Sequence, residues 1–160
     1  MQTIYNPEIV KPMWKELADI GVQPLTTPEE VDRVMADKGG TILMVVNSIC
    51  GCAAGHARPG VAVALQNKVI PDKLYTVFAG VDREATQTAR RYMTSMPPSS
   101  PSIALFKDGM LAYMLHRSQI ERLDIDGVAN QLVQAFDEHC SSPGPSVAPE
   151  VMSKAFNMSF

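Results

Sequence analysis

The chain has 160 residues, the length of a single domain, and its 46% apolar and 19% charged residues suffice to close one hydrophobic core. Fourteen basic and seventeen acidic side chains leave a formal net charge of −3, which argues against a nucleic-acid surface of clustered Lys and Arg. No run approaches the roughly 18 to 20 consecutive apolar residues of a membrane span, and the first residues lack the pattern of a secretory signal. We therefore expect a cytoplasmic protein that binds neither nucleic acid nor membrane.

The first half of the chain alternates between helical and strand patterns. Apolar residues at helical spacing predict a helix over 7–20. Residues 27–30 (TPEE) combine an N-cap, a first-turn proline and a glutamate, so they start a second helix, which Gly39 and Gly40 end. The apolar run 41–46 (TILMVV) predicts a buried strand, and 61–70 predicts a helix whose start the preceding Pro-Gly pair breaks or kinks.

The second half begins with a predicted strand and closes with a predicted helix. Its elements are a strand, a helix, two strands and a helix, over residues 74–79, 82–93, 102–106, 110–115 and 126–139. Asp82 is placed to cap the first of these helices. The proline-rich stretch 97–101 excludes regular structure, and Asp108-Gly109 between two apolar runs predicts a β-hairpin.

This order of elements predicts an α/β fold. Strands separated by helices favour parallel pairing with helices on both faces, and the hairpin adds an antiparallel edge strand. We expect a three-layer α/β/α sandwich with about four strands in a mixed sheet, formed by residues 1–140. Residues 141–160 begin with a Ser-, Pro- and Gly-rich run and are expected to form a flexible C-terminal tail, with a short docking segment over 151–160 as the alternative.

The candidate active site is the segment Cys50-Gly51-Cys52. Its two cysteines, with a third at Cys140, are too few and too closely spaced for a secreted disulfide scaffold, and they indicate redox or metal chemistry in a reducing compartment. The segment falls between a predicted strand and the following helix, where the helix dipole favours a thiolate. We expect an outward-facing nucleophile at Cys50, which Cys52 approaches through a bend at Gly51. The alternative is a pair of buried, inert thiols.

Four further residues each have a functional and a structural interpretation. His56 could stabilise a thiolate or share a metal with the two cysteines, and Arg58 could lower the thiol pKa by its charge; both could equally be solvated side chains near the helix start. Arg117 follows the hairpin and is expected in solvent, or on a basic surface that attracts an anionic thiol. Cys140 ends the last helix as a packed or terminal thiol, or as a second redox thiol.

The segment 100–109 (SPSIALFKDG) resembles the thioredoxin superfamily. Members of that superfamily place a proline just before a core strand, five residues ahead of a phenylalanine that is followed by lysine, a turn residue and glycine. The residues at these positions here are Pro101, Phe106, Lys107, Asp108 and Gly109. The resemblance implies a cis Ser100–Pro101 peptide bond beside the cysteines, with exposed backbone groups that pair with a substrate.

Taken together, the segments ICGCAAGHARPG, PPSSPSIALFKDG and AFDEHC resemble the bacilliredoxin family over about residues 5–140. The resemblance implies a thiol–disulfide oxidoreductase that removes bacillithiol, a low-molecular-weight thiol, from mixed disulfides on oxidised client proteins. Cys50 takes the thiol adduct in this scheme, and either Cys52 or another thiol then resolves it. Members of the family have also been considered general disulfide oxidoreductases or isomerases.

In the expected site, the catalytic residues are Cys50 and Cys52. The residues expected to bind the substrate are Gly51, Ser100 and Pro101. The site needs no metal and no cofactor beyond the cysteine pair, and its partners are S-thiolated client proteins and a low-molecular-weight thiol. The oligomeric state stays open. A non-enzymatic metal carrier that uses the two cysteines and His56 is the alternative from another class, but the proline and strand context favours the enzyme.

Overall fold

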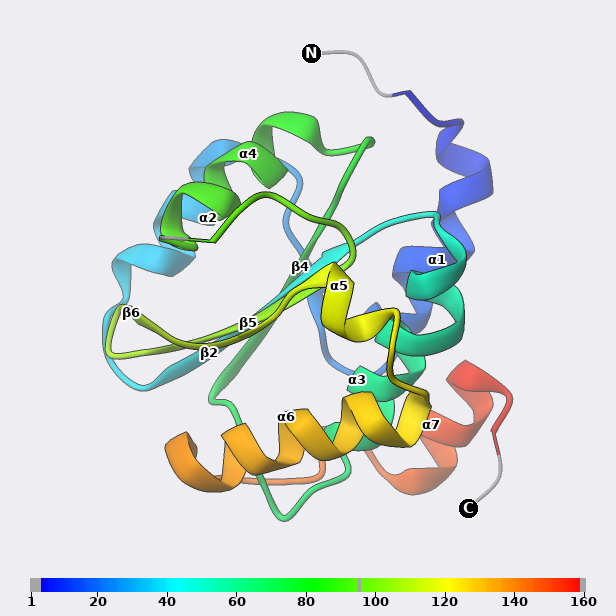
Figure 1. Ribbon diagram of the computed structural model, residues 1–160, viewed down its shortest axis with the longest axis vertical. Coiled ribbons are helices and arrows are strands. Elements are labelled where there is room, and N and C mark those ends of the chain that lie inside the picture. The colour runs from blue at the N-terminus through cyan, green and yellow to red at the C-terminus, as the bar shows by residue number, and fades with distance from the viewer. Residues whose placement is uncertain (1–3, 95, 159–160) are drawn as a thin grey trace.

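A mixed sheet of five strands forms the centre of the protein in the computed structural model, which describes residues 4–94 and 96–158 (Figure 1). In spatial order its strands are β1 (Gln23–Pro24), β4 (Lys73–Phe78), β2 (Thr41–Asn47), β5 (Ser102–Lys107) and β6 (Met110–Leu115). β1 and β2 pair parallel to β4, while β5 pairs antiparallel to both β2 and β6. The predicted mixed sheet is confirmed, and β1 is a short strand beyond the four that the sequence indicates.

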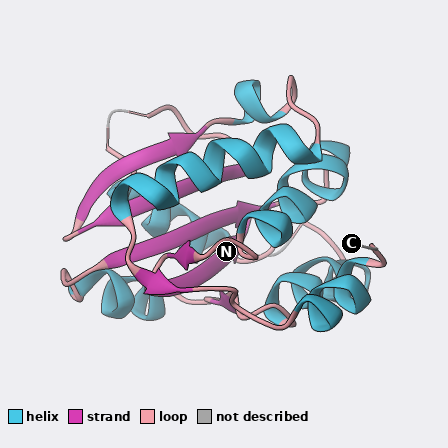
Figure 2. Cartoon of the chain, turned by 90° about the horizontal axis from the view of Figure 1, so that it is seen from below, coloured by secondary structure: helices cyan, strands magenta, loops and turns pink. Residues whose placement is uncertain are grey.

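Helices cover both faces of the sheet (Figure 2). One face carries α2 (Pro28–Ala36) and α4 (Arg83–Tyr92), and the other carries α1 (Pro7–Ala18), α3 (Arg58–Ala64), α6 (Ile125–His139) and α7 (Pro149–Phe156). The short helix α5 (Arg117–Ile120) follows β6. Strand β2 buries all seven of its residues between the two layers, which explains its continuously apolar sequence. Within the described residues, none of the helices is long and apolar enough to cross a membrane.

Two local signals of the sequence act as expected. The hydroxyl of Thr27 accepts the backbone N–H of Glu30 at 3.2 Å and so caps α2, although the helix ends at Ala36, before the two glycines. The β5–β6 turn has a positive φ at both central residues, 52° at Asp108 and 83° at Gly109. That conformation is the one for which an Asp-Gly pair is favoured in a hairpin.

The predicted helix over 61–70 is wrong at both ends. Helical structure begins earlier, in a π-helix, η1 (Ala53–Ala57), that runs directly into α3. Pro59 does not break this helix, and it lies in the first turn of α3, directly after the π-helical segment. α3 ends at Ala64, and the later residues form β3 (Val69–Ile70), which pairs antiparallel with β7 (Ser142–Pro143).

The segment after Cys140 packs against the core, in place of the expected flexible tail. Met152 on α7 is fully buried in the same cluster as Leu17 of α1, and Figure 1 shows α7 lying beside α3. The hydroxyl of Ser146 donates to the carbonyl of Ile20 at 2.8 Å. The structure therefore agrees with the alternative of a docked segment, which forms the helix 149–156.

Asp82 precedes α4 as expected, but it does not cap the helix through its side chain. The carboxyl group lies instead at an apolar cavity of about 230 Å³ that Trp14 and Phe78 also line. Burial raises the pKa of Asp82 to about 6, because a low-dielectric environment disfavours the charged carboxylate.

Candidate active site

The Cys50-Gly51-Cys52 segment lies at the carboxyl end of the central strand β2 and leads into η1. The backbone N–H groups of Ala53 and Ala54 both donate to the carbonyl of Cys50, at 3.1 and 3.2 Å. Cys50 is therefore the residue from which the helical hydrogen bonds start, the position that the strand-to-helix argument predicts. Both thiols of the segment are free and partly buried.

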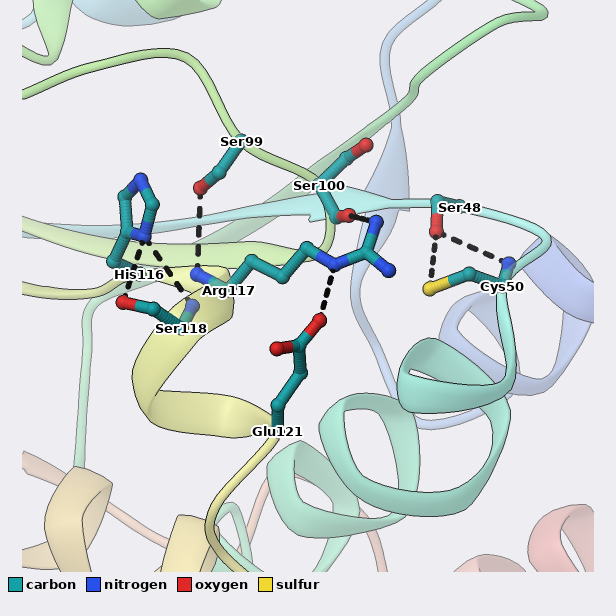
Figure 3. A network of polar contacts seen from close by, with 8 residues as sticks. All are labelled: Ser48, Cys50, Ser99, Ser100, His116, Arg117, Ser118 and Glu121. Carbon is teal, nitrogen blue, oxygen red and sulfur yellow. Dashed lines mark hydrogen bonds and ion pairs between the residues drawn. The ribbon is translucent and has the colours of Figure 1, made fainter.

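Ser48 holds the sulfur of Cys50 from the strand side (Figure 3). Its hydroxyl lies 3.2 Å from Cys50 Sγ and also accepts the backbone N–H of Cys50 at 3.2 Å. Ser48 is itself fixed, because its N–H donates to the side-chain oxygen of Asn47 at 2.8 Å. The hydroxyl therefore presents its proton to the sulfur, which is the interaction that stabilises a thiolate.

Arg117, the first residue of α5, faces the same sulfur from the other side. In Figure 3 its guanidinium group extends toward Cys50. Its Nη1 donates to the carbonyl of Ser100 at 3.1 Å, its Nε pairs with Glu121 at 2.7 Å, and its backbone N–H donates to the hydroxyl of Ser99 at 3.4 Å. These three contacts fix the cation beside the thiol.

These surroundings make the two thiols of the segment unequal. Burial alone would raise the pKa of Cys50, but hydrogen bonds from Ser48 and from the backbone N–H groups of Ala53 and Cys52, together with the charge of Arg117, outweigh it and lower that pKa. Burial raises the pKa of Cys52, and the neighbouring Cys50 thiolate raises it further. Cys50 is therefore the thiol with the greater thiolate character.

The expected cis peptide bond between Ser100 and Pro101 is present. Pro101 is buried, and Ser100 lines one groove together with Cys50. The Ser100 carbonyl, one of the backbone groups expected to pair with a substrate, already accepts a hydrogen bond from Arg117. Gly51 is exposed, has no left-handed φ, and a Cβ added there would meet no atom within 4 Å. In this reduced state the backbone therefore does not require glycine at position 51.

Arg58 is not the cation that acts on the thiol. Its guanidinium group is buried and pairs with Glu16, while Nη1 donates to Asn47 Oδ1 at 3.0 Å and to the carbonyl of Ser48 at 2.9 Å. It therefore ties the start of α3 to the end of β2 and to α1. The charge beside Cys50 comes from Arg117, for which the sequence favoured a solvated position.

His56 and Cys140 do not join the cysteine pair. His56 Nδ1 contacts the carbonyl of Leu123, and no group of three or more His, Cys, Asp and Glu side chains in residues 4–94 and 96–158 is arranged to hold a metal ion. Cys140 follows α6, where burial raises its pKa and the Thr41 hydroxyl lies beside it. Thr41 starts β2 and Cys50 follows the end of β2, so the strand's length of about 20 Å separates the two thiols.

Ser48 and Arg117 are the site residues that sequence reasoning did not assign to the thiol. The serine two residues before Cys50 has the spacing of a side chain that turns back on its own backbone, and this was a usable local signal. Arg117 had no such signal, since the fold alone brings α5 to the end of β2.

The fold is that of thioredoxin. A thioredoxin from Fasciola hepatica matches with a TM-score of 0.50 at 16% identity and covers 74% of this chain and 99% of its own. The oxidised mitochondrial thioredoxin 3 of Saccharomyces cerevisiae matches with a TM-score of 0.50 at 15% identity and covers 75% and 97%. At such low identity these structures establish the architecture alone.

Sequence relatives narrow the class. A family model described as disulphide isomerase matches residues 5–140. Bacilliredoxin from Cytophaga hutchinsonii is 50% identical over 84% of this chain and 99% of its own length, and bacilliredoxin from Salinibacter ruber is 44% identical over 95% and 96%. The chain therefore belongs to the bacilliredoxin family, and it is a thiol–disulfide oxidoreductase with a thioredoxin fold.

Proposed function

We propose that this protein removes bacillithiol from mixed disulfides on oxidised client proteins in the cytoplasm, with Cys50 as the nucleophile and Cys52 as the resolving thiol. The observation that carries the proposal is the inequality of the two thiols. Ser48, Arg117 and backbone N–H groups lower the pKa of Cys50 against the effect of burial, whereas burial raises the pKa of Cys52. The proposed reaction has two steps: the first requires a thiolate that attacks the mixed disulfide, and the second requires another thiol that stays protonated until the adduct has formed.

The first step transfers the small thiol from the client to Cys50. The Cys50 thiolate attacks the bacillithiol sulfur of the mixed disulfide, a new S–S bond forms, and the client sulfur leaves with the electron pair as a thiolate. In the second step the Cys52 thiolate attacks Cys50 Sγ and releases the bacillithiol thiolate. This leaves a Cys50–Cys52 disulfide that an external thiol reduces.

A general disulfide isomerase is the second candidate, favoured by the description of the matching family model. In that reaction Cys50 attacks a protein–protein disulfide and releases one client thiolate, and a different thiol of the client then attacks the mixed disulfide, so that a new disulfide forms in the client and Cys50 leaves as a thiolate. Both reactions use the same nucleophile. They differ in whether the adduct on Cys50 is a small thiol or a protein.

Intact-mass spectrometry after reaction with a bacillithiol-modified client protein tests the proposal. In the Cys52→Ala variant we expect one bacillithiol adduct on Cys50 and one client thiol released, whereas Cys50→Ala should give neither. Cys140→Ala is the matched control and should behave as the wild type, because that thiol lies at the opposite end of β2. The proposal fails if the Cys52→Ala protein carries no adduct and the client stays modified. A protein–protein adduct alone would support the isomerase.

A further inference from the structure

A groove of about 320 Å³ opens beside Cys50 and is lined by three arginines, Arg83, Arg90 and Arg117. Arg83 and Arg90 are seven residues apart on α4, so they lie on one face of that helix. None of the described residues that line the groove is Asp or Glu. A chain with a net charge of −3 thus gathers positive side chains around its nucleophile.

The positive charge of Arg90 is not balanced by a carboxylate among the described residues. Its Nη2 donates to the carbonyl of Ser99 at 3.2 Å, but its Nε is buried and has no hydrogen-bond partner among the described residues. Arg90 makes no ion pair with a carboxylate in residues 4–94 and 96–158, and burial lowers its pKa. The guanidinium group is therefore partly buried without a counter-ion among the described residues, and an anion in the groove would compensate its charge.

Arg117 also keeps part of its guanidinium group available. Glu121 and the Ser100 carbonyl engage Nε and Nη1, while Nη2 has no hydrogen-bond partner among the described residues. In Figure 3 this third nitrogen lies on the side of the Cys50 sulfur. An anionic group bound there would be held within reach of the reacting atoms.

We infer that the arginine groove binds carboxylates on the low-molecular-weight thiol of the mixed disulfide, so that the protein prefers anionic thiol adducts. This inference rests on the proposed function and names the substrate class of the same site. Arginine is suited to the task, because its planar donors match a carboxylate in a charge-assisted contact. A groove of this volume lies near the lower end of the range for small-molecule sites, about 300 to 1,000 Å³.

The groove also decides which sulfur of the mixed disulfide is attacked. Carboxylates held by the arginines bring the sulfur of the small thiol against Cys50 and leave the client sulfur on the outer side. The new bond then forms to the small thiol, and the client leaves as a free thiolate with the bonding electrons. The opposite orientation would attach the client to Cys50, which the groove disfavours.

A charge series of model disulfides tests the inference in the Cys52→Ala protein, which retains the adduct. The probes are 2-thiopyridyl disulfides of mercaptosuccinate, 2-mercaptoethanol and cysteamine, whose thiol halves are anionic, neutral and cationic. The thiopyridine is the better leaving group, so its release measures transfer of the small thiol to Cys50. Each rate is divided by the rate of the same disulfide with free 2-mercaptoethanol, which removes the intrinsic reactivity.

We expect the normalised rate of the mercaptosuccinate probe to exceed that of the cysteamine probe about tenfold at low ionic strength, and less than about threefold in 0.5 M KCl. Arg83→Gln should reduce the low-salt preference to about threefold or less, and Arg83→Lys should restore most of it. Arg33→Gln is the control: Arg33 is exposed in the last turn of α2 and does not line the groove. It changes the net charge equally and should keep the tenfold preference.

The possible results separate carboxylate binding in the groove from the proposed function itself. Equal normalised rates across the three probes overturn the inference while leaving the proposed function intact, since Cys50 still accepts the adducts. A preference that survives Arg83→Gln and Arg90→Gln unchanged, in variants whose circular dichroism is native, also overturns it. If none of the probes forms an adduct on Cys50, the proposed function itself fails.

Discussion

Replacing Arg58 with methionine should destabilise the fold by about 3 kcal/mol without changing the ionisation of the active-site thiol. The Arg58 side chain is 5% exposed and pairs with Glu16, and it donates to Asn47 and to the Ser48 carbonyl. Breaking a buried ion pair from one side costs about 3 to 5 kcal/mol. The low end applies because Glu16 is 26% exposed and regains water, while methionine replaces the aliphatic part of the arginine.

Two measurements separate this structural role from an electrostatic one. Guanidinium unfolding followed by the fluorescence of Trp14, the single tryptophan, gives the loss of stability. The pH dependence of Cys50 alkylation in a Cys52→Ala, Cys140→Ala background gives the thiol midpoint. Arg58→Met should leave that midpoint in place. Arg117→Met should raise it, because the cation beside the Cys50 thiolate is lost, and should change the stability little since Arg117 is exposed.

Either of two results would contradict this structural role of Arg58. A loss of less than about 1 kcal/mol on Arg58→Met would mean that the buried guanidinium does not tie α3 to β2. A shift of the alkylation midpoint as large as that of Arg117→Met would mean that Arg58 acts on the thiol directly.

Three further predictions concern the thiol, a carboxyl group and two glycines. Ser48→Ala should move the alkylation midpoint of Cys50 to higher pH, since a hydrogen bond to the thiolate is lost; an unchanged midpoint would exclude that bond. The pKa of Asp82 is raised to about 6, above about 3.9 in the unfolded chain, so stability falls as pH rises from about 4 through 6. Asp82→Asn should therefore gain about 1 kcal/mol over wild type at pH 7.5, after allowance for solvent screening, and less at pH 4.5; equal differences at both pH values would contradict this. Gly60→Ala should lower the free energy of unfolding by about 1 to 3 kcal/mol, because the new Cβ would lie 2.4 Å from a side-chain atom of α6. Gly55→Ala, with open space around it, should be neutral or stabilising by up to about 1 kcal/mol in the same unfolding assay, and a loss as large as that of Gly60→Ala would refute the packing argument.

The sequence predicts well those helices, strands and turns that their own residues determine. β2 needs only a run of apolar residues that two core layers bury, and the β5–β6 turn needs only a pair that accepts positive φ, Asp108-Gly109. β3 and α7 have no such local cause. Val69–Ile70 forms a strand because residues 142–143 pair with it, and Met152 is buried because it packs against residues of α1 and α3. Such partners lie too far along the chain for a local pattern to indicate them.

The candidate site divides in the same way. Cys50 and Cys52 stand out by their spacing, and Pro101 by its distance from Phe106 in the thioredoxin pattern. Arg58 was a candidate for lowering the thiol pKa because it is close to the cysteines in sequence, yet it pairs with Glu16 and donates to Asn47 at the end of β2. Arg117 is distant in sequence and lies at the sulfur. Closeness in sequence therefore pointed to Arg58, whereas the cation beside the Cys50 thiol is Arg117.

The π-helix η1 sets a constraint on the length of this segment. The backbone N–H of Arg58 reaches back to the carbonyl of Ala53, one residue further than in an α-helix. One residue of an α-helix corresponds to a rotation of about 100°. A deletion that converted η1 into α-helical turns would therefore break one of two contacts, because either Cys50 rotates away from Ser48 or Arg58 rotates away from Glu16. The number of residues between Cys50 and Arg58 therefore decides whether the contacts of both residues can form, and a helical segment shortened by one residue would lose one of them.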